Sequence, residues 1–377
     1  MRKGWEYKKL GEVATYINGY AFKPDQWKES GTPIVRIQNL NNENAPYNYY
    51  DGEVPDKVKI QNGDLLISWS ASLGAYIWHG GNAFLNQHIF KVAFDKTDID
   101  KFFLKYAVTS KLAAMAEQVH GATMKHIVKK DFDNTQIPYP PLSTQLAIVS
   151  ELDKINELIR LKKEQLKDFG NLAQSLFYEM FGDPVENEKG WEVKKIGDLA
   201  LVKTGPFGSM LHKEDYICDG IPLVNPVHMK DFKIVPDLDF TISKEKASEL
   251  ENYLLKSNDV VFARRGDIGR CAIVSEAEQG FICGTGSLFV RFSKEIESIF
   301  IMYIIRCDSF SKHLISKAKG ATMLNINSNT IADLRIPLPP LSLQRLFAQR
   351  IEQIEREKSE VQKSIQDLET LLASRMQ

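Results

Sequence analysis

Polar side chains that can hydrogen bond to nucleic-acid bases follow several short apolar runs of this sequence. Arg and Lys donate to the acceptors of guanine, whereas Asn and Gln match the donor and acceptor of adenine. Loops that project from a rigid scaffold commonly carry such contacts. The first half offers Gln38, Asn39, Asn41, Ser68, Trp69, Ser70, Asn86, Gln87, His88, Lys125 and His126. The second half offers Asn225, His228, Lys230, Arg264, Arg265, Arg270, Thr285, Ser287, Asn325 and Asn327.

Each candidate also has an ordinary structural interpretation. A polar surface residue is more often solvated than bound to a base, and Trp69 and Trp78 suit a hydrophobic core equally well. The two halves nevertheless differ at matched places, because Ser68-Trp69-Ser70 aligns with Ala263-Arg264-Arg265 at an offset of 195. If both segments contact DNA, the two half-sites differ, and the second is the one expected to present guanine or phosphate.

Motifs for catalysis are weak. An adenine methyltransferase holds its flipped base on an Asn/Asp-Pro-Pro-Tyr/Phe loop. Tyr139-Pro140-Pro141-Leu142 and Leu338-Pro339-Pro340-Leu341 lack the polar first residue, and both precede long helical patterns, so they indicate hinges. No ATP-binding Gly-x-x-x-x-Gly-Lys-Ser/Thr loop and no His-Glu-x-x-His pair occurs. The segment Gly284–Ser287 reads as a strand-edge turn rather than an anion site.

Composition bounds the class of protein. The 377 residues are 43% hydrophobic and carry a net charge of −1. DNA-binding proteins that act alone usually show a basic surplus, so either the chain does not bind nucleic acid or a partner supplies part of the positive surface. Four cysteines without Cys-x-x-Cys spacing (Cys218, Cys271, Cys283 and Cys307) are expected to be reduced and buried, with no metal site. No apolar run spans a membrane and no signal peptide is recognised, which predicts a cytoplasmic protein.

The chain repeats itself. Gly121-Ala122-Thr123-Met124 through Leu142 returns as Gly320-Ala321-Thr322-Met323 through Leu341 at an offset of 199. The opening Gly4-Trp5-Glu6 returns as Gly190-Trp191-Glu192 at an offset of 186. Two similar units on one chain suit a target with two similar but non-identical halves.

Each repeat reads as a mixed α/β unit followed by a long helix. Short β-branched or aromatic runs predict strands at 33–37, 64–69 and 89–94, and at 222–224, 259–262 and 287–292. Apolar residues three and four apart predict single helices at 99–118 and 296–315. We therefore expect domains at 1–142 and 183–341 and spacer helices at 143–182 and 342–377. Ser143 and Ser342 are expected to cap these helices, and Gly182-Asp183-Pro184 to end the first.

The long helices show strict heptads, which predict a two-helix coiled coil. The seam residues are Ile148, Leu152, Ile155, Ile159, Leu166, Phe169, Phe347, Ile351, Ile354, Val361, Ile365 and Leu368, with Lys162 and Lys358 as polar members. About 36 helical residues span on the order of 54 Å. An antiparallel pair would hold two α/β domains at opposite ends of a rigid spacer related by a pseudo-twofold axis, which matches the local symmetry of B-DNA and sets the distance between half-sites.

In these features the chain resembles the specificity (S) subunit of type I DNA restriction–modification enzymes. The resemblance covers the whole chain. It rests on the Gly-Trp-Glu-x-Lys-Lys-Leu/Ile-Gly-Glu/Asp opening of each half, on the Ile-Pro-x-Pro-Pro-Leu…Gln hinge before each helix, and on Leu176-Phe177-Tyr178-Glu179-Met180-Phe181-Gly182 between the halves. The second copy stops at Gln377, and this shortened end is expected to weaken docking at that edge.

The resemblance implies two target recognition domains that each read one half of a bipartite, asymmetric site in double-stranded DNA. It implies helices that set the spacer and dock DNA adenine methyltransferase subunits, with restriction and translocase subunits joining outside. It also implies no catalysis and no cofactor of its own, because S-adenosylmethionine and ATP belong to the partner subunits. Two alternatives stay open: an enzyme with an unrecognised active site, and a scaffold whose two domains bind proteins.

Overall fold

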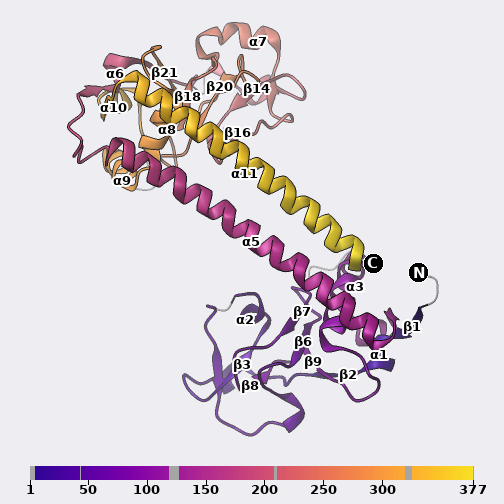
Figure 1. Cartoon of the computed structure of the whole chain (residues 1–377). Coiled ribbons are helices and arrows are strands. Elements are labelled where there is room, and N and C mark those ends of the chain that lie inside the picture. The colour runs from indigo at the N-terminus through magenta and orange to yellow at the C-terminus, as the bar shows by residue number, and fades with distance from the viewer. Residues whose placement is uncertain (1–4, 43, 119–126, 208–209, 319–324, 377) are drawn as a thin grey trace. The chain divides into compact units, whose positions relative to one another are not determined.

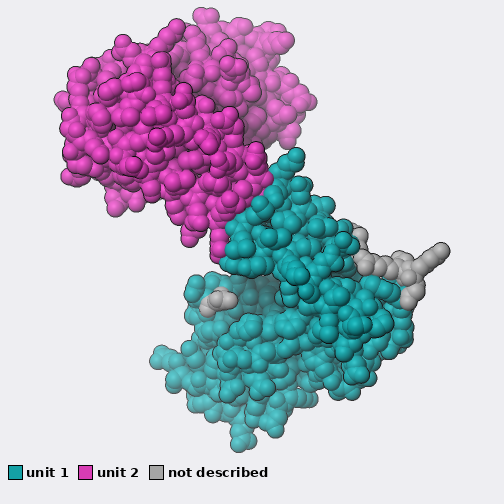
Figure 2. Space-filling model, in the orientation of Figure 1, with its two compact units in different colours: residues 1–163, 363–377 teal, residues 164–362 magenta. Residues whose placement is uncertain are grey.

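The computed structural model describes residues 5–42, 44–118, 127–207, 210–318 and 325–376. Lys125, His126 and both Gly-Ala-Thr-Met segments lie outside these residues. The chain divides into two compact units, which are coloured in Figure 2. Unit 1 comprises residues 1–163 and 363–377, and unit 2 comprises residues 164–362. Each unit therefore contains one globular part together with segments of both long helices.

An antiparallel sheet with strand order β2-β9-β6-β7 forms the centre of unit 1. Its strands are β2 (Thr15–Asn18), β9 (Ile89–Ala93), β6 (Leu65–Ser68) and β7 (Gly74–Ile77). The apolar run of β6 is buried along its whole length, as expected for a central strand covered on both faces. The helix α3 (Lys101–Gln118) supplies Phe103, Leu104 and Val108 to the same core.

A second, mixed sheet of unit 1 has the order β4-β3-β8-β5, in which β3 pairs with β8 in parallel. Its strands are β4 (Asn48–Tyr50), β3 (Thr32–Val35), β8 (Ala83–Leu85) and β5 (Lys59–Ile60). The predicted strand at 33–37 ends earlier, because Ile37 begins the short helix α2 (Ile37–Asn41). The chain passes directly from β8 into β9, so the segment 86–88 joins the two sheets.

Unit 2 repeats both sheets. The antiparallel sheet has the order β12-β21-β18-β19, with strands β12 (Ala200–Thr204), β21 (Ser287–Phe292), β18 (Val260–Ala263) and β19 (Cys271–Ile273). The mixed sheet has the order β13-β17-β14-β20, with strands β13 (Tyr216–Ile217), β17 (Thr241–Ile242), β14 (Ile221–Val224) and β20 (Ile282–Cys283). The parallel pair β14–β20 corresponds to β3–β8. Unit 2 adds the hairpin β15 (Met229–Lys230) and β16 (Lys233–Ile234) and the helix α7 (Lys244–Glu249).

The repeated sequence motifs close each globular part. In unit 1, β1 (Glu6–Lys9) pairs antiparallel with β10 (Gln136–Tyr139), and α1 (Leu10–Val13) lies against α4 (Lys129–Asn134). In unit 2, β11 (Val193–Lys195) pairs with β22 (Arg335–Pro337), and α6 (Ile196–Leu199) lies against α10 (Ser328–Ala332). In each unit, the strand at the Trp-Glu opening pairs with the strand that contains the Ile-Pro of the hinge. The two motifs recur together because these strands pair with each other.

The two spacer helices are α5 (Leu142–Phe181) and α11 (Leu341–Met376), drawn in magenta and yellow in Figure 1. They pack antiparallel within each unit. In unit 1, Glu151 pairs with Arg375 at 3.0 Å and Lys163 with Glu369 at 2.9 Å. In unit 2, the rings of Phe177 and Phe181 lie 5.7 and 5.3 Å from that of Phe347. The expected fold class is confirmed: two similar α/β units with two long antiparallel helices.

The residues predicted for the heptad seam are buried or half-buried in these helices. Buried are Leu152, Ile155, Ile159, Phe347, Ile351, Ile354, Val361 and Ile365; half-buried are Ile148, Lys162, Leu166, Phe169, Lys358 and Leu368. Residues between the seam positions are mostly exposed. The first helix ends after Phe181, where Gly182 takes a positive φ of 78° that glycine adopts without strain.

A buried glutamine joins each long helix to its own globular part. Gln145 is fully buried; its Nε2 donates to the Pro140 carbonyl at 2.9 Å, and its Oε1 accepts from the Asp100 amide at 2.8 Å. Gln344 repeats both bonds, to the Pro339 carbonyl at 2.8 Å and from the Glu297 amide at 3.1 Å. Asp100 and Glu297 directly precede helices, whose first amides lack partners within the helix. The glutamine of the hinge motif thus satisfies one such donor and fixes the start of the long helix against it.

Three expectations are wrong in detail. The long helices begin at Leu142 and Leu341, so Ser143 and Ser342 lie in the first turn, and the carbonyls of Pro141 and Pro340 accept the first amides instead. The helix expected at 296–315 is two helices, α8 (Ser298–Arg306) and α9 (Asp308–Lys317), which meet at an extended Cys307. Asp308 and Ser309 favour a helix start over a helix interior, and the apolar spacing continues through the break. Cys218 is exposed, whereas the other three cysteines are buried.

Removing the hinge glutamine should loosen the junction it forms. We expect Gln145→Ala to leave the Asp100 amide and the Pro140 carbonyl without partners and to destabilise the junction by about 2 kcal/mol. Hydrogen-exchange mass spectrometry of peptides covering residues 98–105 should then show faster amide exchange. Gln165→Ala, an exposed glutamine on the same helix, is the control. Equal exchange rates in both variants would contradict the proposed role of Gln145.

Burial also decides which thiols react. Burial raises the pKa of the Cys271 thiol to about 12 and that of Cys307 to about 11, and it raises the pKa of Cys283 as well. Since the thiolate is the nucleophile, these three thiols stay protonated and unreactive at about pH 8. A thiol reagent should therefore modify Cys218 in the native protein and the others only after unfolding, as peptide mapping would show. Rapid native labelling of Cys283 would contradict the buried environment of β20.

Candidate nucleic-acid interface

The register of the antiparallel sheet in unit 2 brings several candidates to one end. Ala263 faces Ser287, Phe262 faces Cys271, and Thr204 faces Leu288. The carboxyl ends of β12 and β18 therefore lie beside the amino ends of β19 and β21. We call this edge, with the residues that follow or precede these strands, the loop end of unit 2. It carries Asn225, Arg264, Arg265, Arg270, Thr285, Ser287 and Asn325.

Arg264 follows β18 and is held by its backbone on both sides. Its amide donates to the Gly286 carbonyl at 3.0 Å, and its carbonyl accepts from the Ile326 amide at 2.9 Å. The next residue, Arg265, forms a β-bridge with Asn325. The Arg264 side chain is thus presented from a strand-like segment whose backbone is fixed between two neighbouring chain segments.

Three buried polar atoms of residues at this loop end have no hydrogen-bond partner among the described residues: Arg264 Nε, Ser287 Oγ and Asn325 Oδ1. Burial lowers the pKa of the Arg264 guanidinium, and the charge of Arg265 lowers it further. A buried donor or acceptor without a partner destabilises the free protein. Ser287 is fully buried, as Ser68 is in unit 1, and its hydroxyl is out of reach of a bound duplex. Arg264 is only half-buried, and Arg is the side chain best matched to guanine and phosphate.

The neighbouring arginines differ in how they are held. Arg265 is exposed. Arg270 is oriented by Asp267, with Nη2 at 2.7 Å from its carboxylate, and by the Pro226 carbonyl at 3.2 Å. Thr285 lies in the turn between β20 and β21, and the Gly286 amide of that turn donates to Asn225 Oδ1 at 3.1 Å. The segment Gly284–Ser287 closes as a turn through the Ser287 amide and the Gly284 carbonyl.

Unit 1 has the same backbone frame with different side chains. The Trp69 amide donates to the His88 carbonyl at 3.4 Å, and the Trp69 carbonyl accepts from the Ile127 amide at 3.0 Å. Trp69 therefore occupies the place of Arg264, and His88 that of Gly286. The half-buried Trp69 ring stacks on Phe90 with centroids 5.6 Å apart and meets His88 edge-on at 5.5 Å. Gln87 Nε2 lies 3.3 Å from His88 Nε2, and Asn86 and Gln87 share this loop end.

The structure removes Asn39, Ser68 and His228 from the base-reading candidates. Asn39 Oδ1 accepts from the Arg36 amide at 3.0 Å, and His228 Nδ1 accepts from the Asn225 amide at 3.2 Å, so the two side chains close the same turn in the two units. Asn39 is 3% exposed, His228 is 8% exposed, and Ser68 is fully buried with its hydroxyl bonded to the Ser72 carbonyl. Their hydrogen-bonding groups serve the fold, because short polar side chains readily bond to nearby backbone.

Other candidates lie apart from the arginines or beyond the described residues. Gln38 is exposed beside its turn, and Lys230 is exposed on the β15–β16 hairpin. Trp78 is 6% exposed and belongs to the hydrophobic core, which was one of its two interpretations. Lys125 and His126 lie outside the described residues.

Two exposed apolar residues near the loop end, Phe207 and Val227, were not among the residues predicted from the sequence. Comparison with their repeat partners Ala21 and Gln38 would have found them.

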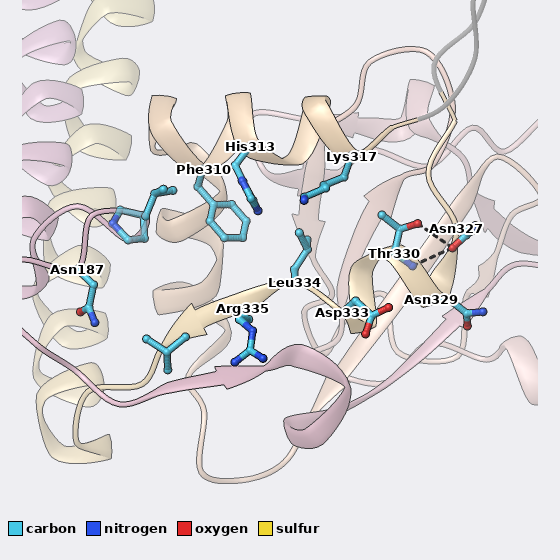
Figure 3. Close-up of a pocket in the computed structure, with 13 residues that line it drawn as sticks. Asn187, Phe310, His313, Lys317, Asn327, Asn329, Thr330, Asp333, Leu334 and Arg335 are labelled. Carbon is cyan, nitrogen blue, oxygen red and sulfur yellow. Dashed lines mark hydrogen bonds between the residues drawn. The ribbon is translucent and has the colours of Figure 1, made fainter.

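Asn327 belongs to a different feature of unit 2, a cavity of about 690 Å³ (Figure 3). Its side chain caps α10 by accepting from the Thr330 amide at 2.8 Å and hydroxyl at 3.0 Å. Phe310, His313 and Lys317 of α9 project toward the cavity from one side, and Leu334 and Arg335 line the other. Since Asn327 uses its oxygen for capping, we assign it to the fold rather than to base recognition.

The described residues hold no group of three or more His, Cys, Asp or Glu arranged to bind a metal ion. Within the same part of the chain, no helix combines the length and apolar character needed to cross a bilayer.

Comparison with known proteins places the chain in a family. Residues 2–168 and 188–370 match the model of the type I restriction modification DNA specificity domain, so one copy falls in each repeat. The specificity subunit of the type I restriction enzyme EcoBI from Escherichia coli is 23% identical, over 93% of this chain and 79% of that protein. The MjaVIII specificity subunit from Methanocaldococcus jannaschii is also 23% identical, over 98% of this chain and 92% of that protein.

Solved structures show the same fold. A chain from work on complex assembly and conformational transition of the type I R-M system superposes with a TM-score of 0.68 at 18% identity, covering all of this chain and 97% of the other. The S subunit of the type I restriction–modification system from M. genitalium superposes with a TM-score of 0.54 at 14% identity, covering all of this chain and 96% of the other.

Proposed function

The chain belongs to the type I restriction–modification DNA specificity family, and we propose that its two units read the two halves of one bipartite DNA site. One observation carries this proposal: the same backbone frame holds Trp69 in unit 1 and Arg264 in unit 2. A shared scaffold presents both side chains at the same position, and their different chemistry selects different bases. The site is therefore asymmetric, and unit 2 contacts guanine or phosphate through Arg264.

Catalysis belongs to partner subunits in this proposal. A DNA adenine methyltransferase binds S-adenosylmethionine and modifies an adenine in each half-site, while restriction and translocase subunits that use ATP join outside, in the cytoplasm. Exposed leucines on α5 support docking on the helices: Leu158 and Leu161 in unit 1 are 48% and 46% exposed, and Leu172 in unit 2 is 53% exposed. Apolar side chains in this position suit a helical partner surface.

The net charge of −1 also favours shared DNA binding. Phosphate neutralisation supplies much of the affinity of a protein for DNA. A chain without a basic surplus is expected to bind duplex DNA weakly and with strong salt dependence, until methyltransferase subunits close around the duplex.

Mapping N6-methyladenine tests the proposal directly. DNA from cells carrying this chain and a methyltransferase subunit should show a two-part motif with a fixed gap, and the motif should vanish when the gene for this chain is deleted. The two half-motifs should differ, because the loop ends of the two units differ. A single continuous motif, or methylation that persists without this chain, would refute a bipartite reader.

Arg264 should determine the half-motif read by unit 2. We expect Arg264→Ala to weaken binding of the assembled complex to a duplex with the mapped site by about 1–3 kcal/mol. Arg264→Lys keeps the charge and loses the planar fork, so it should retain affinity for random DNA and lose discrimination at the guanine. Arg350→Ala, an exposed cation on α11, is the control. Unchanged discrimination in Arg264→Lys, measured by competition binding, would count against base contact by this residue.

A further inference from the structure

Two exposed apolar side chains flank the Gly284–Gly286 turn at the loop end of unit 2. Phe207 is 66% exposed and Val227 is 65% exposed. Arg264, Arg265 and Arg270 lie at the same end, as described above. These two apolar side chains leave most of their surface in solvent at the end that carries three arginines. Such an arrangement is typical of a surface that meets another molecule.

The loop that carries Phe207 is pressed against this turn. The Gly205 amide donates to the Ser287 carbonyl at 3.0 Å, and a Cβ on Gly205 would overlap the Gly284 carbonyl oxygen, so only glycine allows this approach. Pro206 is buried, and the Met210 amide donates to the Phe207 carbonyl at 2.9 Å. Phe207 therefore projects from a backbone that is held close to the strand ends.

Val227 is held on the other side of the same turn. Asn225 Oδ1 accepts from the Gly286 amide, and the Pro226 ring packs against Gly286. The Pro226 carbonyl accepts from Arg270 Nη1 at 3.2 Å. Val227 follows Pro226 directly, so its position is tied both to the turn and to an arginine.

Unit 1 builds the same two positions with small or polar residues. The Gly19 amide donates to the Ile89 carbonyl at 3.1 Å, and a Cβ on Gly19 would overlap the Asn86 carbonyl oxygen, as at Gly205. Ala21, two residues after Gly19, occupies the position that Phe207 occupies in unit 2. The turn closed by Asn39 carries Gln38 where the turn closed by His228 carries Val227. The apolar pair is thus a property of unit 2 on a scaffold that both units share.

We propose that Phe207, supported by Val227, is an apolar wedge that inserts into a base step of the half-site read by unit 2. Arginines that hold phosphates beside an inserted apolar side chain are the chemistry by which proteins unstack and kink a duplex. Pyrimidine–purine steps unstack most easily, so the half-motif of unit 2 contains such a step at the wedge. The half-site read by unit 1 meets no such wedge. This inference rests on the proposed function.

The test exchanges the wedge for the residues of unit 1. The variants are Phe207→Ala and Val227→Gln, with Phe207→Leu as the conservative change. Phe240→Ala is the matched control, because Phe240 is a 57% exposed phenylalanine of unit 2 whose ring lies 6.2 Å from Tyr216, next to the mixed sheet. Each variant is assembled with the methyltransferase and mixed with a duplex that carries the mapped site and 2-aminopurine in either half.

Because the methyltransferase flips a target adenine in each half, the 2-aminopurine is placed at steps that do not adjoin those adenines. At these positions, the wild-type complex should raise 2-aminopurine fluorescence at one step of the unit 2 half and leave the unit 1 half unchanged. Phe207→Ala should abolish that rise and weaken binding at least fivefold, Val227→Gln should reduce both effects, and Phe207→Leu and Phe240→Ala should retain them. Because Phe207 is exposed, the variants should melt at the wild-type temperature.

The inference and the proposed function fail in different ways. If methylation mapping yields no two-part motif, the proposed function fails. If the motif appears but Phe207→Ala leaves fluorescence and affinity at wild-type values, the wedge is wrong and the bipartite reader stands. Loss of complex formation between Phe207→Ala and the methyltransferase in the absence of DNA would assign Phe207 to a protein interface and overturn the wedge as well.

Discussion

Closure of each globular part onto the start of its long helix is the constraint on which the rest of the structure depends. The strand after Trp191 pairs with the strand before the prolines, and the buried Gln344 then bonds the hinge to the first turn of α8. Unit 1 repeats this closure with Gln145. Because the junction is short, buried and hydrogen bonded, each helix leaves its sheet in a fixed direction. If the hinge were loose, the globular part would have no defined position relative to its own helix.

The sheets separate scaffold from recognition. Backbone hydrogen bonds hold the chain at Trp69 and at Arg264 in the same way, and glycines at positions 19 and 205 allow the same close approach of two segments. Backbone bonds do not depend on side-chain type, so residues at the loop end change without disturbing the sheet. This explains how one duplicated frame carries a tryptophan with a histidine in one unit and arginines with an exposed phenylalanine in the other.

Charge and burial together favour a division of labour. The chain carries a net charge of −1, without the basic surplus that is usual for proteins that bind DNA alone. It presents exposed arginines at the end of a sheet and leucines along a helix. In the proposed function, these features suit a subunit that selects a site beside catalytic partner subunits.

The repeat, the heptads and the strand runs were readable from the sequence, because periodicity and composition are local properties that burial imposes on every turn or strand. The family followed from motifs at matched offsets. Only the tertiary structure separated side chains that serve the fold from those that can contact DNA bases. Asn39, Ser68 and His228 resemble base-reading residues in sequence, yet their polar atoms form hydrogen bonds with nearby backbone. It alone brought Phe207, Val227 and Arg264 together, since strand register joins residues that lie far apart along the chain.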